Sequence, residues 1–169
     1  MKSRFLQNLN ELPGPVWLFG AFGISRLAEW LFALLLKCVG GDLWLSWGAG
    51  GMQLLGLAAA LLPVGLFVCL VQRRPCGMPL VRWYAGLQML AHGISVIAPL
   101  FTGYDPESAG GYMLLVRAEV LNLVWAGLWF CFLYYLEHSR ALASLMPPEN
   151  RRALWWTVVP MGALVFFCM

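Results

Sequence analysis

Four apolar segments of membrane-spanning length constrain this chain more than any other feature of its sequence. A helix needs about 20 mostly apolar residues to cross the hydrocarbon core of a bilayer. Residues 15–39, 48–71, 81–101 and 112–136 meet that requirement. Because unpaired backbone groups are costly in lipid, each segment is expected to be a helix. The sequence therefore predicts an all-α integral membrane protein built on a four-helix transmembrane bundle.

The composition excludes an ordinary water-soluble domain. Hydrophobic residues make up 61% of the chain and charged residues 11%, whereas soluble domains carry about 25% charged residues. The formal net charge of +3 is too small for the basic surface of a nucleic-acid-binding protein. We therefore expect the lipid bilayer to be the main partner of the chain, and we expect no nucleic acid.

The two ends of the chain differ in character. Residues 1–14 form a polar start without the features of a cleavable signal peptide, so the first apolar segment is expected to be retained as a span. Residues 153–169 form an apolar tail that contains Pro160. At about 1.5 Å per residue the tail reaches roughly 25 Å. Two interpretations are open, a short fifth span across a thinned bilayer or a re-entrant or interfacial segment.

The distribution of basic residues predicts the orientation of the spans. Eight of the eleven Lys and Arg residues fall in residues 1–14, 72–82 and 137–152, while the loops around residues 40–48 and 101–113 carry acids and no base. Short loops rich in Lys and Arg stay in the cytoplasm. We therefore expect a multi-pass protein of the bacterial inner membrane with a cytoplasmic N-terminus and a cytoplasmic basic segment at 137–152.

Several polar side chains lie inside the expected spans. Their positions along the helices place them between the midplane and the outer interface, at about 1.5 Å per residue. Their four formal charges sum to zero, and a charge that faces lipid at the bilayer centre costs about 2.5–3.5 kcal/mol on insertion scales. We therefore expect one inward-facing, buried polar cluster. Its members are Arg26, Glu29, Gln53, His92, Arg117, Glu119 and Asn122.

The pairing within this cluster follows from helix geometry. Arg26 and Glu29 are three residues apart and share a helix face. We expect Arg26 to meet Glu29 or Glu119, and Arg117 to meet one of the same two glutamates. Three roles are open for the cluster: locking helix register, forming a functional site, or contacting a partner membrane protein. His92 is expected to hydrogen-bond between helices, with a proton relay as the alternative.

No motif in the sequence predicts catalysis. There is no H-E-x-x-H, G-x-S-x-G, phosphate loop or haem-attachment site. His92 and His138 are too few and too distant in depth to hold a haem or a metal pair, so we expect no catalytic residue, no metal and no cofactor. A basic collar is expected to set topology and to contact anionic lipid headgroups. It consists of Arg73, Arg74, Arg82, Arg140, Arg151 and Arg152.

The order of these features resembles a known family. RRPCGMPLVRWY at 73–84 follows the second span, and the last long span carries Arg117, Trp125, Tyr134 and Tyr135, with Ser139 and Arg140 just after it. This pattern resembles the four-span bacterial inner-membrane family called domain of unknown function 2569, over residues 13–145. The family tends to have an acid where Gln53 stands, and it usually ends soon after the Ser-Arg pair. The resemblance implies topology and compartment, and no mechanism.

Four functions are open, and the first below is the one that we expect. The first is an accessory, scaffolding or self-assembling subunit without catalytic activity, which binds another membrane protein or itself. The second is a small transporter or channel with an outward-facing cavity lined by Arg26, Glu29, His92, Arg117 and Glu119. Because one chain of four or five spans has little interior, this function is expected to need a dimer or a larger ring. The third is an immunity or stress protein that blocks a membrane-active toxin. The fourth, a membrane enzyme that acts on lipids, is disfavoured because the sequence shows no nucleophile with a base.

Overall fold

The computed structural model describes residues 4–40, 47–102 and 109–146, and within these ranges it is helical with no strand. The all-α prediction is therefore confirmed. The apolar tail 153–169 lies outside the described residues, so its two interpretations stay open. The helices, in chain order, are α1 Arg4–Asn10, α2 Gly14–Gly40, α3 Trp47–Val71, α4 Gly77–Thr102, α5 Ala109–His138 and α6 Arg140–Leu145.

Each expected span corresponds to one long helix, but the helices are not equally apolar. Within the described part of the chain, α2, α3 and α5 are long and apolar enough to cross a membrane. The helix α4, which carries Arg82, Gln88 and His92, is not among them. The described chain is thus all-helical with three candidate membrane-spanning helices, and the four-helix transmembrane bundle stays a prediction.

The ends of several helices follow from local chemistry. Proline fits the first turn of a helix, and Pro15 is the second residue of α2. The carbonyl of Pro13 accepts from the backbone N–H of Val16 at 3.0 Å. The helix α6 begins after Ser139, whose Oγ accepts from the backbone N–H of Leu142 at 3.3 Å. Serine is one of the preferred residues at this N-cap position.

Glycines of α2 bring it close to α3. A Cβ atom placed on Gly23 would lie 3.1 Å from the backbone nitrogen of Val64, and one placed on Gly20 would lie 2.7 Å from the ring of Phe67. Lipid tails are as apolar as leucine, so membrane helices associate through close packing, which small residues allow. The side chain of Pro63 is fully buried at this contact. The close contact between α2 and α3 therefore depends on the lack of a side chain at Gly20 and at Gly23.

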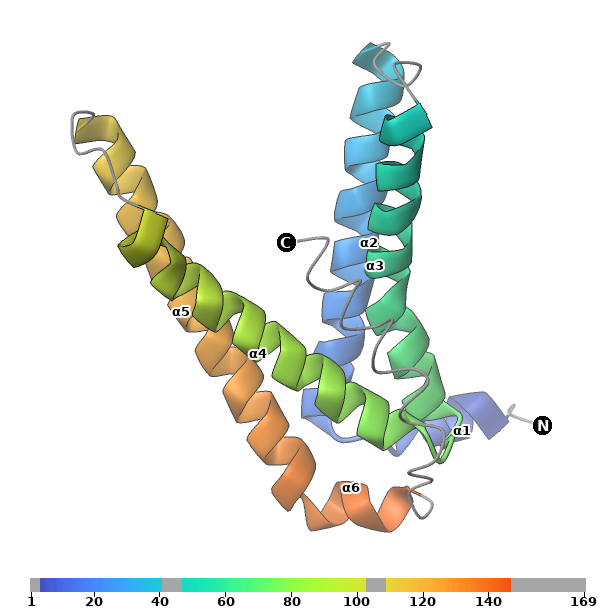
Figure 1. Cartoon of the computed structure of the whole chain (residues 1–169). Helices are drawn as coiled ribbons and strands as arrows, with labels where there is room; N and C mark the ends of the chain where they lie inside the picture. The colour runs from blue at the N-terminus through green and yellow to red at the C-terminus, as the bar shows by residue number, and fades with distance from the viewer. Residues whose placement is uncertain (1–3, 41–46, 103–108, 147–169) are drawn as a thin grey trace.

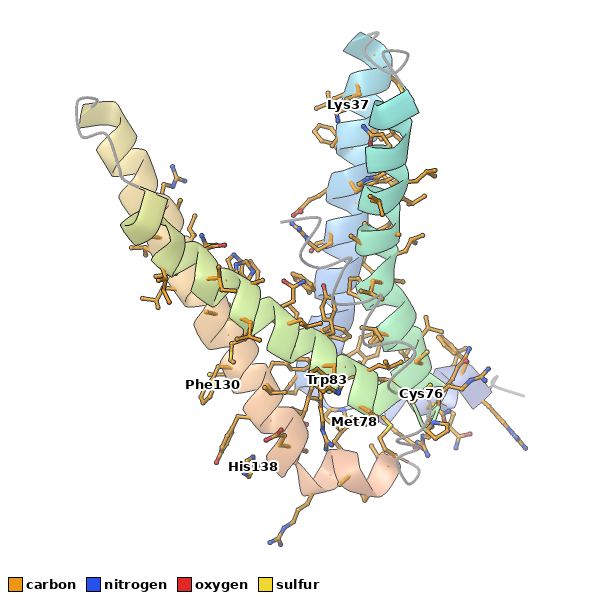
Figure 2. The ribbon with its side chains drawn as sticks, in the orientation of Figure 1. Lys37, Cys76, Met78, Trp83, Phe130 and His138 are labelled. Atoms are coloured by element: carbon orange, nitrogen blue, oxygen red, sulfur yellow. The ribbon has the colours of Figure 1, made fainter. Side chains whose placement is uncertain are left out.

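The helices form two pairs that diverge. Figure 1 shows α2 packed along α3 and α4 packed along α5, with the pairs close together at one end and well separated at the other. The end that holds α1, residues 72–76 and α6 is called the closed end here, and the opposite end is called the open end. Figure 2 shows Cys76 and Met78 at the closed end and Lys37 toward the open end.

The apolar core lies at the closed end. The most deeply buried side chains come from α2 to α6 and belong to residues near the helix ends that meet there. No polar or charged residue is buried among the residues that the structure describes. Side chains with almost no exposed surface at this end include those of Val16, Leu70, Val71, Val81, Leu136 and Leu142.

Candidate functional site

A cleft with a volume of about 580 Å³ lies between the two helix pairs. One wall comes from α2 and α3, and the other comes from α4, with Trp125 of α5 completing the lining. Ligand sites in proteins typically have volumes of about 300–1,000 Å³. The cleft therefore has the size of a site for a small molecule.

An ion pair on α2 supplies the charge of this cleft. Nη1 of Arg26 donates to Oε2 of Glu29 at 3.1 Å, and the two side chains are 57% and 65% exposed. Arg26 lies twelve residues after Gly14, which is about 18 Å along the helix and close to its middle. The pair therefore sits midway along a candidate membrane span while both side chains keep most of their surface accessible.

Three polar side chains of α4 face this ion pair across the cleft. Tyr84, Gln88 and His92 follow one another at intervals of four residues, and all three line the cleft. Nε2 of Gln88 donates to Oη of Tyr84 at 3.0 Å. Nδ1 of His92 lies 3.0 Å from Oδ1 of Asn122, and the imidazole stacks on the indole of Trp125 with ring centroids 6.2 Å apart. The α4 wall is thus a polar row held against α5.

Small residues of α3 form the rest of the lining. Gly56, Ala59 and Ala60 all contact the cleft. A Cβ atom on Gly56 would lie 2.8 Å from Nε1 of Trp30, so the indole of Trp30 rests directly on the α3 backbone. The small side chains leave room for a ligand, and the contact at Gly56 holds one aromatic ring at the side of that space.

An aromatic layer separates the cleft from the closed end. The ring of Phe19 packs against Tyr84, Trp129 and Phe132, with centroids between 5.4 and 6.3 Å apart. The ring of Phe22 meets Trp129 edge to face at 5.0 Å. Aromatic pairs of this geometry contribute about 0.5–1.5 kcal/mol beyond the area that they bury. This layer joins α2 to α4 and α5 and forms the floor of the cleft.

The structure brings together part of the polar cluster that the sequence predicts. Arg26, Glu29 and His92 line the cleft, and Asn122 bonds to His92. The expected contact of Arg26 with Glu29 is present. The cluster is accessible rather than buried, because the helix pairs diverge at this level.

The other members of the predicted cluster lie elsewhere. Gln53, Arg117 and Glu119 do not line the cleft. The expected pairing of Arg117 with Glu29 or Glu119 is absent, since the ion pairs among the described residues are Arg26 with Glu29 and Arg73 with Glu11. Gln53 belongs to α3, and Arg117 and Glu119 belong to α5. Depth along a helix does not determine the direction in which its side chains face, and these three side chains do not face the cleft.

Several lining residues are missing from the predicted cluster. Tyr84 and Gln88 share the face of His92 through their spacing of four residues, which is a signal that the sequence contains. Trp30 and Trp125 belong to the lining as well. Neither has a sequence signal that separates it from other membrane tryptophans, because its position depends on how α2 and α5 are rotated.

The four described arginines of the basic collar lie at the closed end, and two of them join helices there. Arg73 forms an ion pair with Glu11, next to α1. Nη2 of Arg82 donates to the backbone carbonyl of Leu136 at 3.3 Å and links α4 to α5. Both side chains are partly buried. The predicted role in binding lipid headgroups therefore fits these two positions poorly.

The remaining described arginines of the collar are exposed. Arg74 donates through Nε to Oε1 of Gln72 at 3.2 Å, and Arg140 lies on the surface of α6. Arg151 and Arg152 lie outside the described residues. The structure thus leaves Arg74 and Arg140 as collar residues whose side chains lipid headgroups can reach.

Metal-binding residues do not gather in the described part of the chain. Within it, no three or more His, Cys, Asp or Glu side chains come close enough to hold a metal ion together. What the cleft offers to a ligand is one guanidinium, one carboxylate, amide and imidazole groups, and several aromatic faces.

Comparison of the chain with models of protein families, with curated proteins and with solved structures finds no match. The resemblance to the family called domain of unknown function 2569 is neither supported nor refuted, and it stays a prediction. The function is therefore argued from the cleft and from the closed end that supports it.

Proposed function

We propose that this chain is a small, non-catalytic transport protein of the bacterial inner membrane, and that a small polar solute binds in the cleft between its helix pairs. The observation that supports this most is the ion pair of Arg26 and Glu29, which is accessible from the cleft midway along a candidate membrane span. Ionisable residues inside membrane segments commonly mark the paths of substrates and ions.

The cost of placing charge in a membrane supports a hydrated cleft. A single charged side chain at the centre of the bilayer costs about 2.5–3.5 kcal/mol on insertion scales when it faces lipid. Water in a cleft removes much of that cost, because the guanidinium and the carboxylate then keep hydrogen-bond partners. The facing row of Tyr84, Gln88 and His92 makes the opposite wall polar too.

The proposed topology places the closed end in the cytoplasm. Arg73, Arg74, Arg82 and Arg140 lie at this end, whereas Lys37 lies toward the open end (Figure 2). Loops rich in arginine and lysine stay inside. The helix α4 has 26 residues, which extend about 39 Å, and it crosses the membrane beside α5 in this proposal. The cleft then opens outward, and the aromatic layer closes it on the cytoplasmic side.

A single chain offers enough space for this function. From the sequence, a transporter of this size is expected to need a dimer or ring, because a packed bundle of four or five spans has little interior. The cleft of about 580 Å³ lies between two separated pairs rather than inside a packed bundle. The proposal therefore requires no second chain to complete the site.

An accessory or self-assembling subunit is the second candidate function, and a different surface favours it. An apolar groove of about 360 Å³ runs between α2 and α5, with Leu18, Leu128 and Phe132 among its residues. Such a groove suits an apolar helix of a partner or of a second copy. A chain that stays monomeric and without a partner after gentle extraction would count against this function and would leave the transport proposal untouched.

Transport is tested with the purified full-length chain in proteoliposomes. Light scattering after an osmotic shift reports the entry of amino acids, betaines, polyols and simple salts. We expect at least one solute to enter faster than in protein-free vesicles, and Glu29→Gln to slow that entry about ten-fold, because the carboxylate lies on the solute path. Glu119→Gln is the matched control, since it makes the same change at a residue that does not line the cleft.

Two results would contradict the transport proposal. One is entry at the rate of empty vesicles for every solute in the panel. The other is an equal effect of Glu29→Gln and Glu119→Gln on entry. Size-exclusion chromatography and circular dichroism of each variant establish that it has kept its fold before its rate is compared.

A further inference from the structure

We infer that the ligand of this cleft is a zwitterion that joins an anionic group, carboxylate or phosphate, to an ammonium group. The inference rests on the proposed use of the cleft as a binding site, and it names the chemical class of what binds there. It starts from the two opposite charges that α2 presents side by side, Arg26 and Glu29.

Both members of the ion pair keep unused hydrogen-bonding capacity. A guanidinium has five N–H donors and a carboxylate has two oxygens. Among the described residues, Arg26 uses Nη1 alone and Glu29 uses Oε2 alone, each for the other. The remaining donors of Arg26 and Oε1 of Glu29 are therefore available to a ligand, at two points that one small molecule can reach together.

Aromatic rings around the ion pair suit an ammonium group. Phe22, Trp30, Tyr84 and Trp125 all line the cleft, and the faces of such rings attract cations, quaternary ammonium groups above all. Trp30 lies one residue after Glu29 and is held against Gly56. A cation that contacts Glu29 therefore has aromatic surface nearby, while its attached anion meets the guanidinium of Arg26.

Ligands with a single charge fit this arrangement less well. An anion at Arg26 is repelled by the carboxylate beside it, and a cation at Glu29 is repelled by the guanidinium. A zwitterion places each of its charges next to the opposite charge of the pair. It also adds no net charge at mid-membrane, where an uncompensated charge is most costly.

Two sources can supply this chemistry. One is a free zwitterion from the aqueous side, such as an amino acid or a betaine, which enters from the open end. The other is the headgroup of a zwitterionic phospholipid, which enters sideways between the diverging helix pairs (Figure 1). The two sources share the same contacts with Arg26, Glu29 and the rings, so the experiment has one arm for each.

The test is a calorimetric titration of the full-length chain in a maltoside detergent. The probes are glycine betaine and dihexanoylphosphatidylcholine, the latter below its micelle concentration, with choline and acetate as probes of single charge. We expect at least one zwitterion to bind about ten-fold more tightly than choline or acetate, because it satisfies both charges. Binding of betaine alone indicates a free solute, and binding of the phosphocholine probe alone indicates a lipid headgroup.

Variants of the ion pair make the test specific. Arg26→Gln and Glu29→Gln are each expected to weaken zwitterion binding about ten-fold, whereas Arg117→Gln and Glu119→Gln, which make the same changes off the cleft, are expected to leave it unchanged. The double variant Arg26→Glu with Glu29→Arg keeps both charges on the same face. It is expected to regain most of the affinity that each single variant loses. Such recovery would also show that the losses in the single variants do not come from a general folding defect.

The inference is overturned if neither zwitterion binds, if choline or acetate binds as tightly, or if the single variants bind like the parent chain. Failure of the charge-swapped variant to regain affinity also counts against it. Zwitterion binding without any flux would remove the transport proposal and leave this inference. Flux of a singly charged or neutral solute without zwitterion binding would remove this inference and leave the transport proposal.

Discussion

The closed and open ends of this molecule are built from similarly apolar residues and are packed very differently. At the closed end, Val16, Val81 and Leu136 have at most 1% of their surface exposed, whereas Leu31 and Phe32 on the open half of α2 are 50% and 62% exposed. Lipid is as apolar as a leucine side chain, so apolar content alone does not draw membrane helices together. The difference teaches that fitted contacts, rather than hydrophobicity, determine where the two pairs meet.

Because of this asymmetry, the two ends of the molecule are expected to have different roles. The interlocked rings of Phe19, Tyr84, Trp129 and Phe132 hold the pairs together below the cleft. Above them, the Arg26–Glu29 pair and the polar row of α4 remain accessible. We therefore expect most of the stability to come from the closed end and the ligand contacts to come from the open part.

The largest expected effect is at the aromatic layer. Trp129→Ala removes a ring that is 5% exposed and packs against four other rings, so we expect it to lower the free energy of unfolding by about 3–5 kcal/mol. Reversible unfolding in mixed detergent, as the fraction of sodium dodecyl sulfate rises, measures this change. Phe130→Ala is the control, because Phe130 is 57% exposed and its loss is expected to change stability by about 0.5 kcal/mol or less. Equal losses for both variants would show that the aromatic layer does not supply the stability that the comparison assigns to it.

An intermediate effect is expected where α2 approaches α3. Gly23→Ala places a methyl group 3.1 Å from the backbone nitrogen of Val64, and this overpacking is expected to cost about 1–3 kcal/mol. Gly127→Ala makes the same change where nothing lies within 4 Å, and alanine there is expected to stabilise the helix by up to about 1 kcal/mol. The same unfolding assay compares the two variants. A Gly23→Ala protein as stable as the Gly127→Ala protein would show that the α2–α3 contact is looser than the structure has it.

The smallest effect is expected at the polar contact beside the cleft. A double-mutant cycle of His92→Phe and Asn122→Leu isolates the energy of their contact, which we expect to be about 0.6 kcal/mol, the average for polar contacts between membrane helices. A parallel cycle that pairs His92→Phe with Glu119→Gln is expected to give no coupling. A His92–Asn122 coupling as large as the loss in Trp129→Ala would place the source of stability at the cleft and reverse the comparison.

Some of the site was predictable because it depends on one helix at a time. Arg26 and Glu29 meet because residues three apart share a face, and that follows from the sequence. The same rule groups Tyr84, Gln88 and His92, although the predicted polar cluster contains only His92 of these three. The rule does not predict contacts between different helices. The expected contact of Arg117 with Glu29 or Glu119 came instead from the cost of a charge that faces lipid, and it is absent among the described residues.

The sequence by itself determined that this chain is helical, where its long helices run and which of its polar groups share a helix face, because unpaired backbone groups and charges are costly in lipid over the length of each helix. Only the tertiary structure decided that the pairs diverge, that Gly20 and Gly23 set the α2–α3 distance, and that Arg82 turns inward to the carbonyl of Leu136. These features depend on how helices rotate and cross, which is governed by the shapes of particular side chains in contact and not by hydropathy.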